Sequence, residues 1–411
     1  MGGVSMEWKE VTLGDLCEIS SSKRVFAKEY QSDGVPFYRG KEIIAKQKGN
    51  TISNELFISR NRYEEIKARY GVPQQRELLL TSVGTLGVPY VIKEEEFYFK
   101  DGNLTWFRHF NGLDVEYLYY WFLSPYGKNE INTKAIGSTQ KALTIDSLSK
   151  FDIKIPANLD DQRRIASILS SLDRKIELNN KINADLEEMA QAIFKNWFVD
   201  FEPFKDGKFV DSELGMIPEG WKVGRLTDVI KLMPGGTPKT SEPLYWDNGT
   251  IPFFSPKDVS GVYCFETEKH ITEAGLNKCS SNLYPKDTIF ITCRGTVGKV
   301  CLTACDMAMN QSNYAIKAID GYSQYYVYYL VKSVVERLIK KSNGAVFSAI
   351  TSKDFDEEIL IPSQKTVEDF TNVIDSFFRR IFTLGTENSR LSTLRDTLLP
   401  RLMSGEIEVP E

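Results

Sequence analysis

Ile182-Asn183-Ala184-Asp185-Leu186 is echoed by Glu387-Asn388-Ser389-Arg390-Leu391, with Asn and Leu at the same places in both pentapeptides. Asn183 and Asn388 are 205 positions apart, and the same offset relates Leu186 to Leu391. Solenoid repeats recur every ~20–50 residues, so this much longer period indicates a duplicated domain. We therefore predict two similar lobes related by a pseudo-two-fold axis. Proteins use this geometry to read two separated half-sites on DNA.

A long helical pattern surrounds each pentapeptide. Its apolar positions are spaced alternately by four and three residues, which is typical of helices packed along a heptad seam. Each pattern runs for roughly 35–40 residues, longer than most globular helices. Because the seam must be buried, we expect the two copies to pair as an antiparallel coiled-coil rod. The first stripe is Ile165, Leu169, Leu172, Ile176, Asn179, Asn183, Leu186, Ala190, Ile193 and Trp197; the second is Val367, Phe370, Ile374, Phe377, Ile381, Leu384, Asn388, Leu391, Arg395 and Leu398.

Two asparagines interrupt the apolar seams. A polar residue inside a seam costs stability but can fix helix register and the choice of partner. We expect Asn183 and Asn388, with Leu186 and Leu391, to set the register and to help dock a partner. The alternative is that both asparagines are partly exposed.

Short strand-like and helix-like segments fill both lobes, which predicts an α+β fold. Gly84 and Gly87 in lobe one match Gly295 and Gly298 in lobe two, and glycines at such places indicate tight turns. The expected organisation is lobe one at 1–157, a helical region at 158–202, a linker at 203–220, lobe two at 221–362 and a second helical region at 363–411.

Composition excludes several classes of protein. A net charge of −5 does not indicate a globally basic protein, so any nucleic-acid site must be a local patch. No apolar run approaches the ~20 residues of a membrane helix, and the N-terminus lacks a secretion signal. Six cysteines in such a chain favour reduced thiols and a cytoplasmic location, and no spacing predicts a metal site.

The chain lacks the motifs of an enzyme. Residues 295–299 are similar to part of a phosphate loop, but Cys293 and Val300 replace its required Gly and Ser/Thr. Two histidines leave little room for hydrolytic triads, and no methyl-donor motif is present. We therefore expect no catalytic residue and no cofactor bound by this chain.

Side chains suited to reading DNA are present in both lobes. Arg and Lys can contact guanine, Asn and Gln can contact adenine, and Ser and Thr can bind phosphates. For each of these residues, an ordinary solvated position is the competing interpretation. The candidates are Arg39, Lys41, Arg60, Arg62, Ser138, Thr139, Gln140, Lys141, Lys257, Arg294, Asn310 and Gln311.

Two helical segments carry a family resemblance that covers essentially the whole chain. Residues 391–407, LSTLRDTLLPRLMSGEI, resemble the C-terminal helix of type I restriction–modification specificity subunits. Residues 186–201, LEEMAQAIFKNWFVDF, are similar to the central helical region of that family, and residues 137–140 and 221–222 also resemble family positions.

The resemblance implies two target recognition domains joined by two antiparallel helices, each domain reading half of a bipartite, asymmetric DNA sequence. The helices would act as a ruler and as a dock for two methylation subunits. S-adenosylmethionine, ATP and Mg²⁺ would belong to the methylation and restriction subunits. Two other hypotheses stay open: a dimeric scaffold that binds protein without DNA, and a self-sufficient methyltransferase or nuclease.

Overall fold

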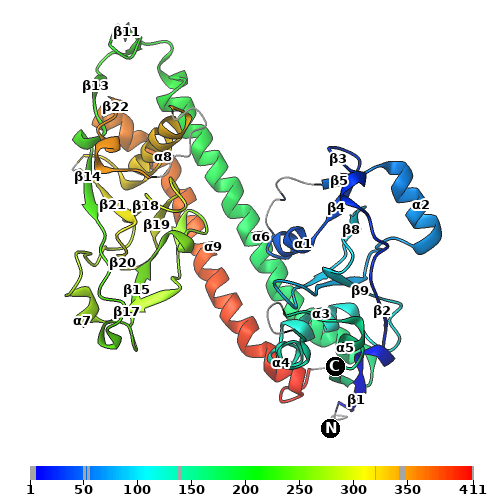
Figure 1. Ribbon diagram of the computed structural model, residues 1–411. Coiled ribbons are helices and arrows are strands. Elements are labelled where there is room, and N and C mark those ends of the chain that lie inside the picture. The colour runs from blue at the N-terminus through cyan, green and yellow to red at the C-terminus, as the bar shows by residue number, and fades with distance from the viewer. Residues whose placement is uncertain are drawn as a thin grey trace, which may run out of the picture. The chain divides into compact units, whose positions relative to one another are not determined.

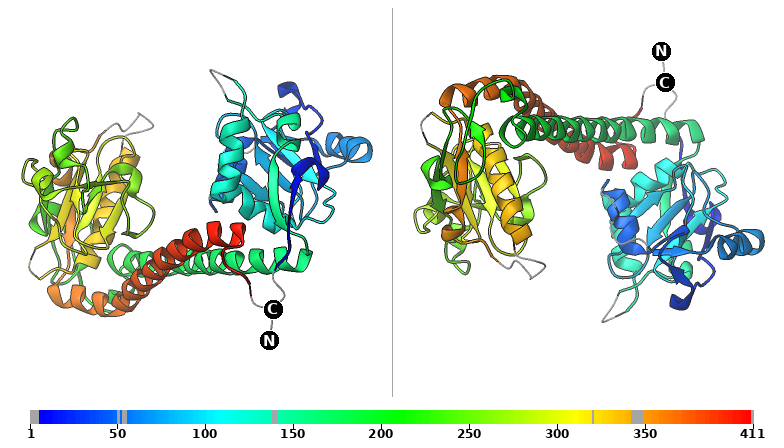
Figure 2. Two further views of the ribbon diagram at one scale, coloured as in Figure 1. Left: turned by 90° about the horizontal axis from the view of Figure 1, so that it is seen from below. Right: turned by 90° about the horizontal axis from the view of Figure 1, so that it is seen from above.

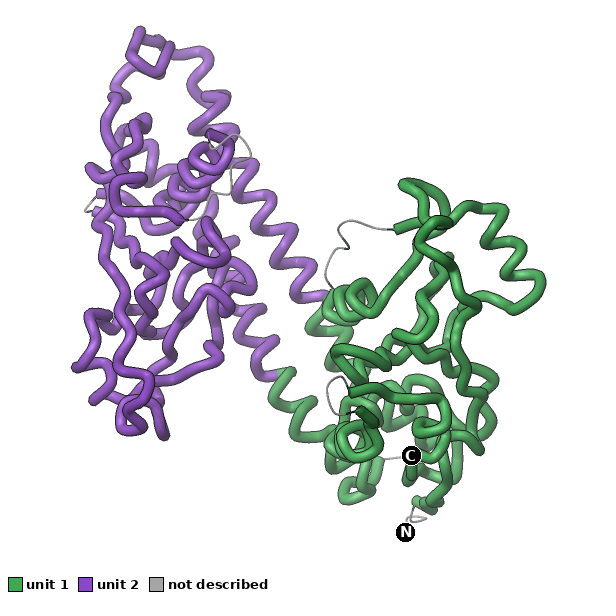
Figure 3. Tube along the Cα trace, in the orientation of Figure 1, with its two compact units in different colours: residues 1–177, 391–411 green, residues 178–390 purple. Residues whose placement is uncertain are grey.

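The computed structural model of the protein describes residues 6–49, 52, 56–137, 141–319, 321–341 and 349–409. The chain divides into two compact units (Figure 3): unit 1 holds residues 1–177 and 391–411, and unit 2 holds residues 178–390. Two long helices, α6 (Leu159–Phe198) and α9 (Gln364–Ser404), each contribute one end to unit 1 and the other to unit 2. None of the helices in the described part of the chain is long and apolar enough to cross a membrane.

Within its described residues, unit 1 contains three small sheets and five shorter helices (Figure 1). An antiparallel pair joins β1 (Trp8–Thr12) to β10 (Asp152–Pro156). The first four-stranded sheet has the order β2 (Glu18–Ser20), β9 (Leu104–Arg108), β6 (Leu78–Thr81) and β7 (Pro89–Val91). The second has the order β3 (Tyr30–Gln31), β5 (Leu56–Ile58), β4 (Val35–Tyr38) and β8 (Tyr98–Phe99). The helices are α1 (Gly40–Gln47), α2 (Arg60–Tyr70), α3 (Val115–Leu123), α4 (Pro125–Lys134) and α5 (Ile145–Ser149).

Unit 2 repeats this plan. Its antiparallel pair joins β13 (Lys222–Arg225) to β22 (Glu358–Ile361). The larger sheet has the order β14 (Ile230–Pro234), β21 (Asn313–Ala318), β18 (Ile289–Thr292), β19 (Val300–Thr303) and β16 (Tyr263–Cys264). The smaller sheet has the order β17 (Lys269–Ile271), β15 (Ile251–Phe254) and β20 (Ala308–Met309). Unit 2 also contains α7 (Glu273–Leu276), α8 (Gln324–Lys341) and the hairpin of β11 (Phe209–Val210) and β12 (Ile217–Pro218).

The strand pairings confirm the predicted duplication and the α+β fold. In both units the first strand of the lobe pairs with the last, just before a long helix. In both units a parallel pair also lies beside the main sheet, β4 with β8 and β15 with β20. Aromatic residues are concentrated in α3 and at the start of α8, and both segments are mostly buried because their large rings fill the lobe cores.

The two long helices pack against each other, and both views in Figure 2 show them side by side. In unit 2, Phe194 lies 5.9 Å from Phe370 between ring centroids, and Asn179 bonds to Asn388. In unit 1, Arg395 Nη1 lies 2.6 Å from Asp173 Oδ1. Within unit 2, the later residue of α6, Phe194, contacts the earlier residue of α9, Phe370. The two helices therefore run in opposite directions, which confirms the predicted antiparallel pairing.

The predicted stripe is wrong by one position at four places along the two helices. The buried residues there are Phe194, Phe198, Phe378 and Leu399, whereas the expected Ile193, Trp197, Phe377 and Leu398 are only partly buried. An α-helix of 3.6 residues per turn drifts by roughly 20° per heptad against a strict 3.5-residue repeat. At these places the buried face therefore moves onto the next residue, which packs into the core of its unit.

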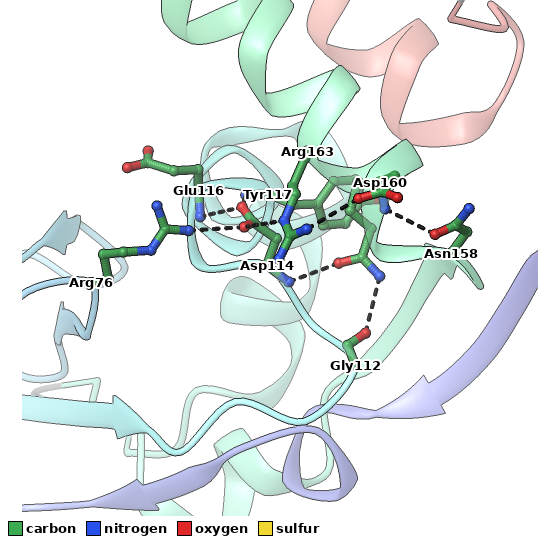
Figure 4. Close-up of polar contacts among 9 residues, drawn as sticks. Arg76, Gly112, Asp114, Glu116, Tyr117, Asn158, Asp160 and Arg163 are labelled. Atoms are coloured by element: carbon green, nitrogen blue, oxygen red, sulfur yellow. Dashed lines mark hydrogen bonds and ion pairs between the residues drawn. The ribbon is translucent and has the colours of Figure 1, made fainter. Parts of the chain in front are cut away.

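A polar clamp holds the first turn of α6 to the lobe of unit 1. Asp114 caps α3, because its Oδ1 accepts hydrogen bonds from the backbone N–H groups of Glu116 and Tyr117 (Figure 4). Arg76 lies 3.0 Å from the other carboxylate oxygen of Asp114. The fully buried Gln162 of α6 accepts from the backbone N–H of Asp114 at 2.8 Å, and its Nε2 donates to the carbonyls of Gly112 and Pro156.

Candidate nucleic-acid interface

The turn between β6 and β7 places a short exposed tip on lobe one. Gly84 and Gly87 have φ angles of +81° and +74°, a region that favours glycine. The buried Thr81 braces the turn, since its carbonyl accepts from the N–H of Gly87 at 2.8 Å and its Oγ1 from the N–H of Val88 at 2.9 Å. The predicted turn is thereby confirmed, and it exposes Gly84 and Thr85.

A hollow of about 320 Å³ lies beside this tip. Arg39 and Lys41 both line it, so the structure brings two of the candidates together with the glycine turn. The carbonyl of Asn103 accepts from the N–H of Ser82 at 2.9 Å, which ties a further lining residue to the base of the turn. The complete lining is Arg39, Gly40, Lys41, Ile44, Val83, Thr85 and Asn103.

A buried carboxylate organises the two cations. Arg39 Nη2 lies 2.6 Å from Glu42 Oε1, and Lys41 Nζ lies 3.4 Å from the same atom. Burial opposes ionisation of Glu42, but hydrogen bonds from the side chain and backbone of Arg39 outweigh it and hold the pKa of Glu42 below its usual value. The Lys41 side chain is 58% exposed against 31% for Arg39, so Lys41 is the more accessible cation.

Arg60 and Arg62 do not line the hollow, and carboxylates balance both. They lie at the start of α2, where Arg60 Nη1 is 2.6 Å from Glu96 Oε2 and Arg62 Nε is 2.9 Å from Glu29 Oε1. Such partners compete with a phosphate for the guanidinium groups. Their positions therefore favour the solvated-face interpretation over phosphate binding.

Among the remaining candidates of lobe one, the structure describes only Lys141. Ala142 forms a bridge with Val83, and the neighbouring Lys141 is exposed. Ser138, Thr139 and Gln140 lie outside the described residues.

Lobe two carries an equivalent turn between β18 and β19. Gly295 and Gly298 have φ angles of +80° and +85°. Thr292 takes the place of Thr81, with its carbonyl accepting from the N–H of Gly298 and its Oγ1 from the N–H of Lys299. Arg294 is exposed at the tip, and no side-chain hydrogen bond or ion pair of Arg294 is found within the described residues.

Two further candidates, Asn310 and Lys257, lie close to the end of β15. The N–H of Asn310 donates to the carbonyl of Phe254 at the end of β15, and the carbonyl of Ser312 accepts from Cys293 at the base of the turn. Lys257 lies three residues after the end of β15, and its side chain is 81% exposed. The Asn310 Oδ1 accepts from Ser312 and Asn313 inside the loop, so that oxygen already has partners.

Sequence reasoning missed several residues of these surfaces. Gln311 bonds to the hydroxyl of Thr237, which brings the loop after β14 to the candidate surface. Gly235 and Gly236 allow that approach, because a Cβ there would lie 2.1 Å from the Asn310 carbonyl oxygen and 2.2 Å from Ser280 Oγ. The glycine pair was the available signal. Thr85 and Val83 were likewise overlooked beside the glycines that marked their turn.

Residues 6–188 and 218–388 match the sequence profile of the type I restriction modification DNA specificity domain. The chain belongs to this family. Specificity subunits recognise the DNA target within a type I restriction enzyme complex and are themselves non-catalytic. The duplicated lobes are thus two copies of a specificity domain.

Known specificity subunits are similar to this chain over most or all of its length. The MjaIX type I restriction enzyme specificity subunit of Methanocaldococcus jannaschii is 28% identical over all of this chain and 96% of its own length. The HindI specificity subunit of Haemophilus influenzae is 29% identical over 64% of this chain and 71% of its own length. A solved S subunit from M. genitalium has the same fold, with a TM-score of 0.58, 15% identity and 97% coverage of both chains.

In this specificity subunit, Asn179 makes the main polar contacts that fix the register of the two long helices. This residue is fully buried, and its Nδ2 donates to Glu387 Oε2 and Asn388 Oδ1, both at 2.9 Å. Asn388 in turn donates to Asn180 at 2.8 Å. Asn388 thus contacts both Asn179 and Asn180 of α6, and it does not bond to Asn183. Leu186 is partly buried against the core of unit 2, and Leu391 is partly buried at the edge of unit 1.

Proposed function

We propose that this specificity subunit reads a bipartite, asymmetric double-stranded DNA target, with one lobe on each half-site. One observation carries the proposal: two equivalent glycine turns present different side chains from the same scaffold. The turns share their bracing threonines and positive-φ glycines, while the tips carry Val83 in one lobe and Arg294 in the other. Two turns with the same backbone but different exposed side chains fit a target with two different half-sites better than a palindromic target.

The long helices have two further roles in this proposal. They set the spacer between the half-sites, and they dock two methylation subunits, through which restriction subunits join the complex. Exposed apolar residues on the helices offer surface for such partners: Leu178, Met189, Val373 and Leu394. S-adenosylmethionine, ATP and Mg²⁺ belong to those partners in this scheme, and the complex works in the cytoplasm.

A lobe exchange tests the modular reading. Residues 1–155 are replaced by the corresponding lobe of a relative, and the chimera is co-expressed with the methylation subunits before methylated DNA is sequenced. We expect one half-site to change while the other half-site is retained. A change in both half-sites would sink the model of one lobe per half-site.

Salt dependence separates DNA recognition from a protein scaffold. Phosphate contacts release counterions, so the logarithm of DNA affinity should fall steeply and linearly with the logarithm of salt concentration. The reconstituted complex is titrated with target DNA at several salt concentrations. An affinity that ignores salt would instead favour a scaffold without DNA contact.

A further inference from the structure

Equivalent backbone hydrogen bonds hold Ser82 in lobe one and Cys293 in lobe two. In lobe one, Ser82 donates its N–H to Asn103 and accepts at its carbonyl from Leu143. In lobe two, Cys293 donates to Ser312 and accepts from Ile350. The next residues, Val83 and Arg294, then form matching bridges with Ala142 and Ala349. Val83 and Arg294 therefore hold equivalent positions on rigid bases.

The surroundings of this position are shared between the lobes. Thr85 and Thr296 are both exposed, each following the first glycine of its turn. Lys41 and Lys257 are both exposed and both stand three residues after the last residue of a parallel-paired strand, Tyr38 or Phe254. Contacts of such hydroxyl and ammonium groups with phosphates position a protein on DNA without carrying sequence information.

The side chain at this position differs between the lobes: it is a charged hydrogen-bond donor in lobe two and an apolar group in lobe one. The Arg294 side chain is exposed, and no hydrogen bond or ion pair of its guanidinium is found among the described residues. Val83 is half-buried and lines the hollow with Lys41. Arginine makes a bidentate contact with O6 and N7 of guanine, whereas an apolar side chain contacts the methyl group of thymine.

We infer that Arg294 reads a guanine in the half-site bound by lobe two, and that Val83 contacts a thymine methyl at the matching place in the other half-site. This inference rests on the proposed function and adds the base class read at one defined position of each lobe. It makes the pair Val83 and Arg294 a source of the asymmetry between the half-sites.

The test is base-resolved. The chain and its R294V, R294K and V83R variants are each co-expressed with the methylation subunits, and methylated adenines are mapped by sequencing. R294V should relax the preference for guanine at one position of one half-site by roughly 10- to 100-fold. R294K should keep the charge but lose most of this discrimination, because an ammonium cannot form the bidentate fork. V83R should alter only the other half-site, toward guanine.

Lys299→Ala is the matched control. Lys299 is exposed on the same turn, so its loss should leave the base preference of the motif unchanged. An unaltered motif in both R294V and R294K would overturn the inference, as would R294V and V83R altering the same half-site. Failure of the wild-type complex to methylate any bipartite motif would instead overturn the proposed function, which keeps the two failures distinguishable.

Discussion

Gly84 and Gly87 stand in one turn but meet different surroundings. Both have positive φ, so alanine at either site costs about 1–2 kcal/mol of backbone strain. A Cβ at position 84 meets nothing within 4 Å, whereas one at position 87 would lie 2.4 Å from Ile131 Cδ1. We expect G87A to lower the urea midpoint clearly more than G84A does, because Ile131 must also move. Equal losses would show that the packing against Ile131 is loose.

The sequence predicted these glycines and their turn from the match with positions 295 and 298. It could not predict which glycine packs against a neighbour, because Ile131 comes from α4, far along the chain. The same holds for Glu42. Its neighbour Lys41 was singled out as a cation, while the buried carboxylate that organises the site became visible only in three dimensions.

Glu42 should make lobe one sensitive to acid. Its folded-state pKa is depressed, so the stability it contributes is present above the unfolded value of ~4.3 and is lost as pH falls through the folded value. E42Q should reduce stability at neutral pH by roughly 1–3 kcal/mol and flatten the loss below about pH 4. Urea denaturation followed at several pH values measures both effects.

Glu64→Gln is the control for this experiment. Glu64 is half-exposed and pairs with Arg60 and Lys67 at 3.8 and 4.0 Å on the surface of α2. Exposed pairs contribute ~0–1 kcal/mol, so this variant should follow the wild-type pH profile closely. If E42Q and E64Q have the same profile, the ion pair with Arg39 does not govern the acid response.

At the scale of elements, the junction between α6 and lobe one depends on one amide. Gln162→Leu would leave the N–H of Asp114 and the carbonyls of Gly112 and Pro156 without their partner, at about 1–3 kcal/mol for each buried group. We expect a loss of several kcal/mol in the unfolding of unit 1. Gln191→Leu, on an exposed position of the same helix, should change little. Comparable losses in the two variants would refute the clamp.

The contrast between the lobes explains why sequence predicted the helices better than their junctions. At the 205-residue offset, Val367 replaces Gln162 and is buried among apolar residues of unit 2. The spacing of apolar residues predicts both helices, because each apolar seam must be buried. It does not distinguish a junction made by a buried polar residue from one made by a buried apolar residue. The same limit hid Asn179, which lay in the predicted stripe without being chosen as the register residue.

For the whole molecule, the internal echo predicted the essential plan of two lobes and two paired helices. Its success has a physical cause, because a repeated core pattern must bury equivalent residues in equivalent ways. The loops proposed to contact DNA follow no such rule. Most of their side chains are at the surface, so the pattern of core residues does not constrain them. Only the shared glycines indicate the positions of these loops.

The ruler hypothesis makes the last prediction. Seven residues inserted after Asn183 in α6 and seven inserted before Leu384 in α9 would preserve the Asn179 to Asn388 contact and the Phe194 to Phe370 packing. Two helical turns add on the order of 10 Å. We therefore expect the spacer in the methylated motif to lengthen by at most about three base pairs, while both half-sites stay the same.

An insertion in α6 alone separates length from register. It would shift α6 against α9 by two turns and leave Asn179 or Phe194 without its partner, so methylation should fall sharply and stability with it. Sequencing of methylated DNA and urea denaturation report the two outcomes independently. If the paired insertion leaves methylation active with an unchanged spacer, the helices join the lobes without measuring the distance between half-sites, and the spacer must be set by the partner subunits.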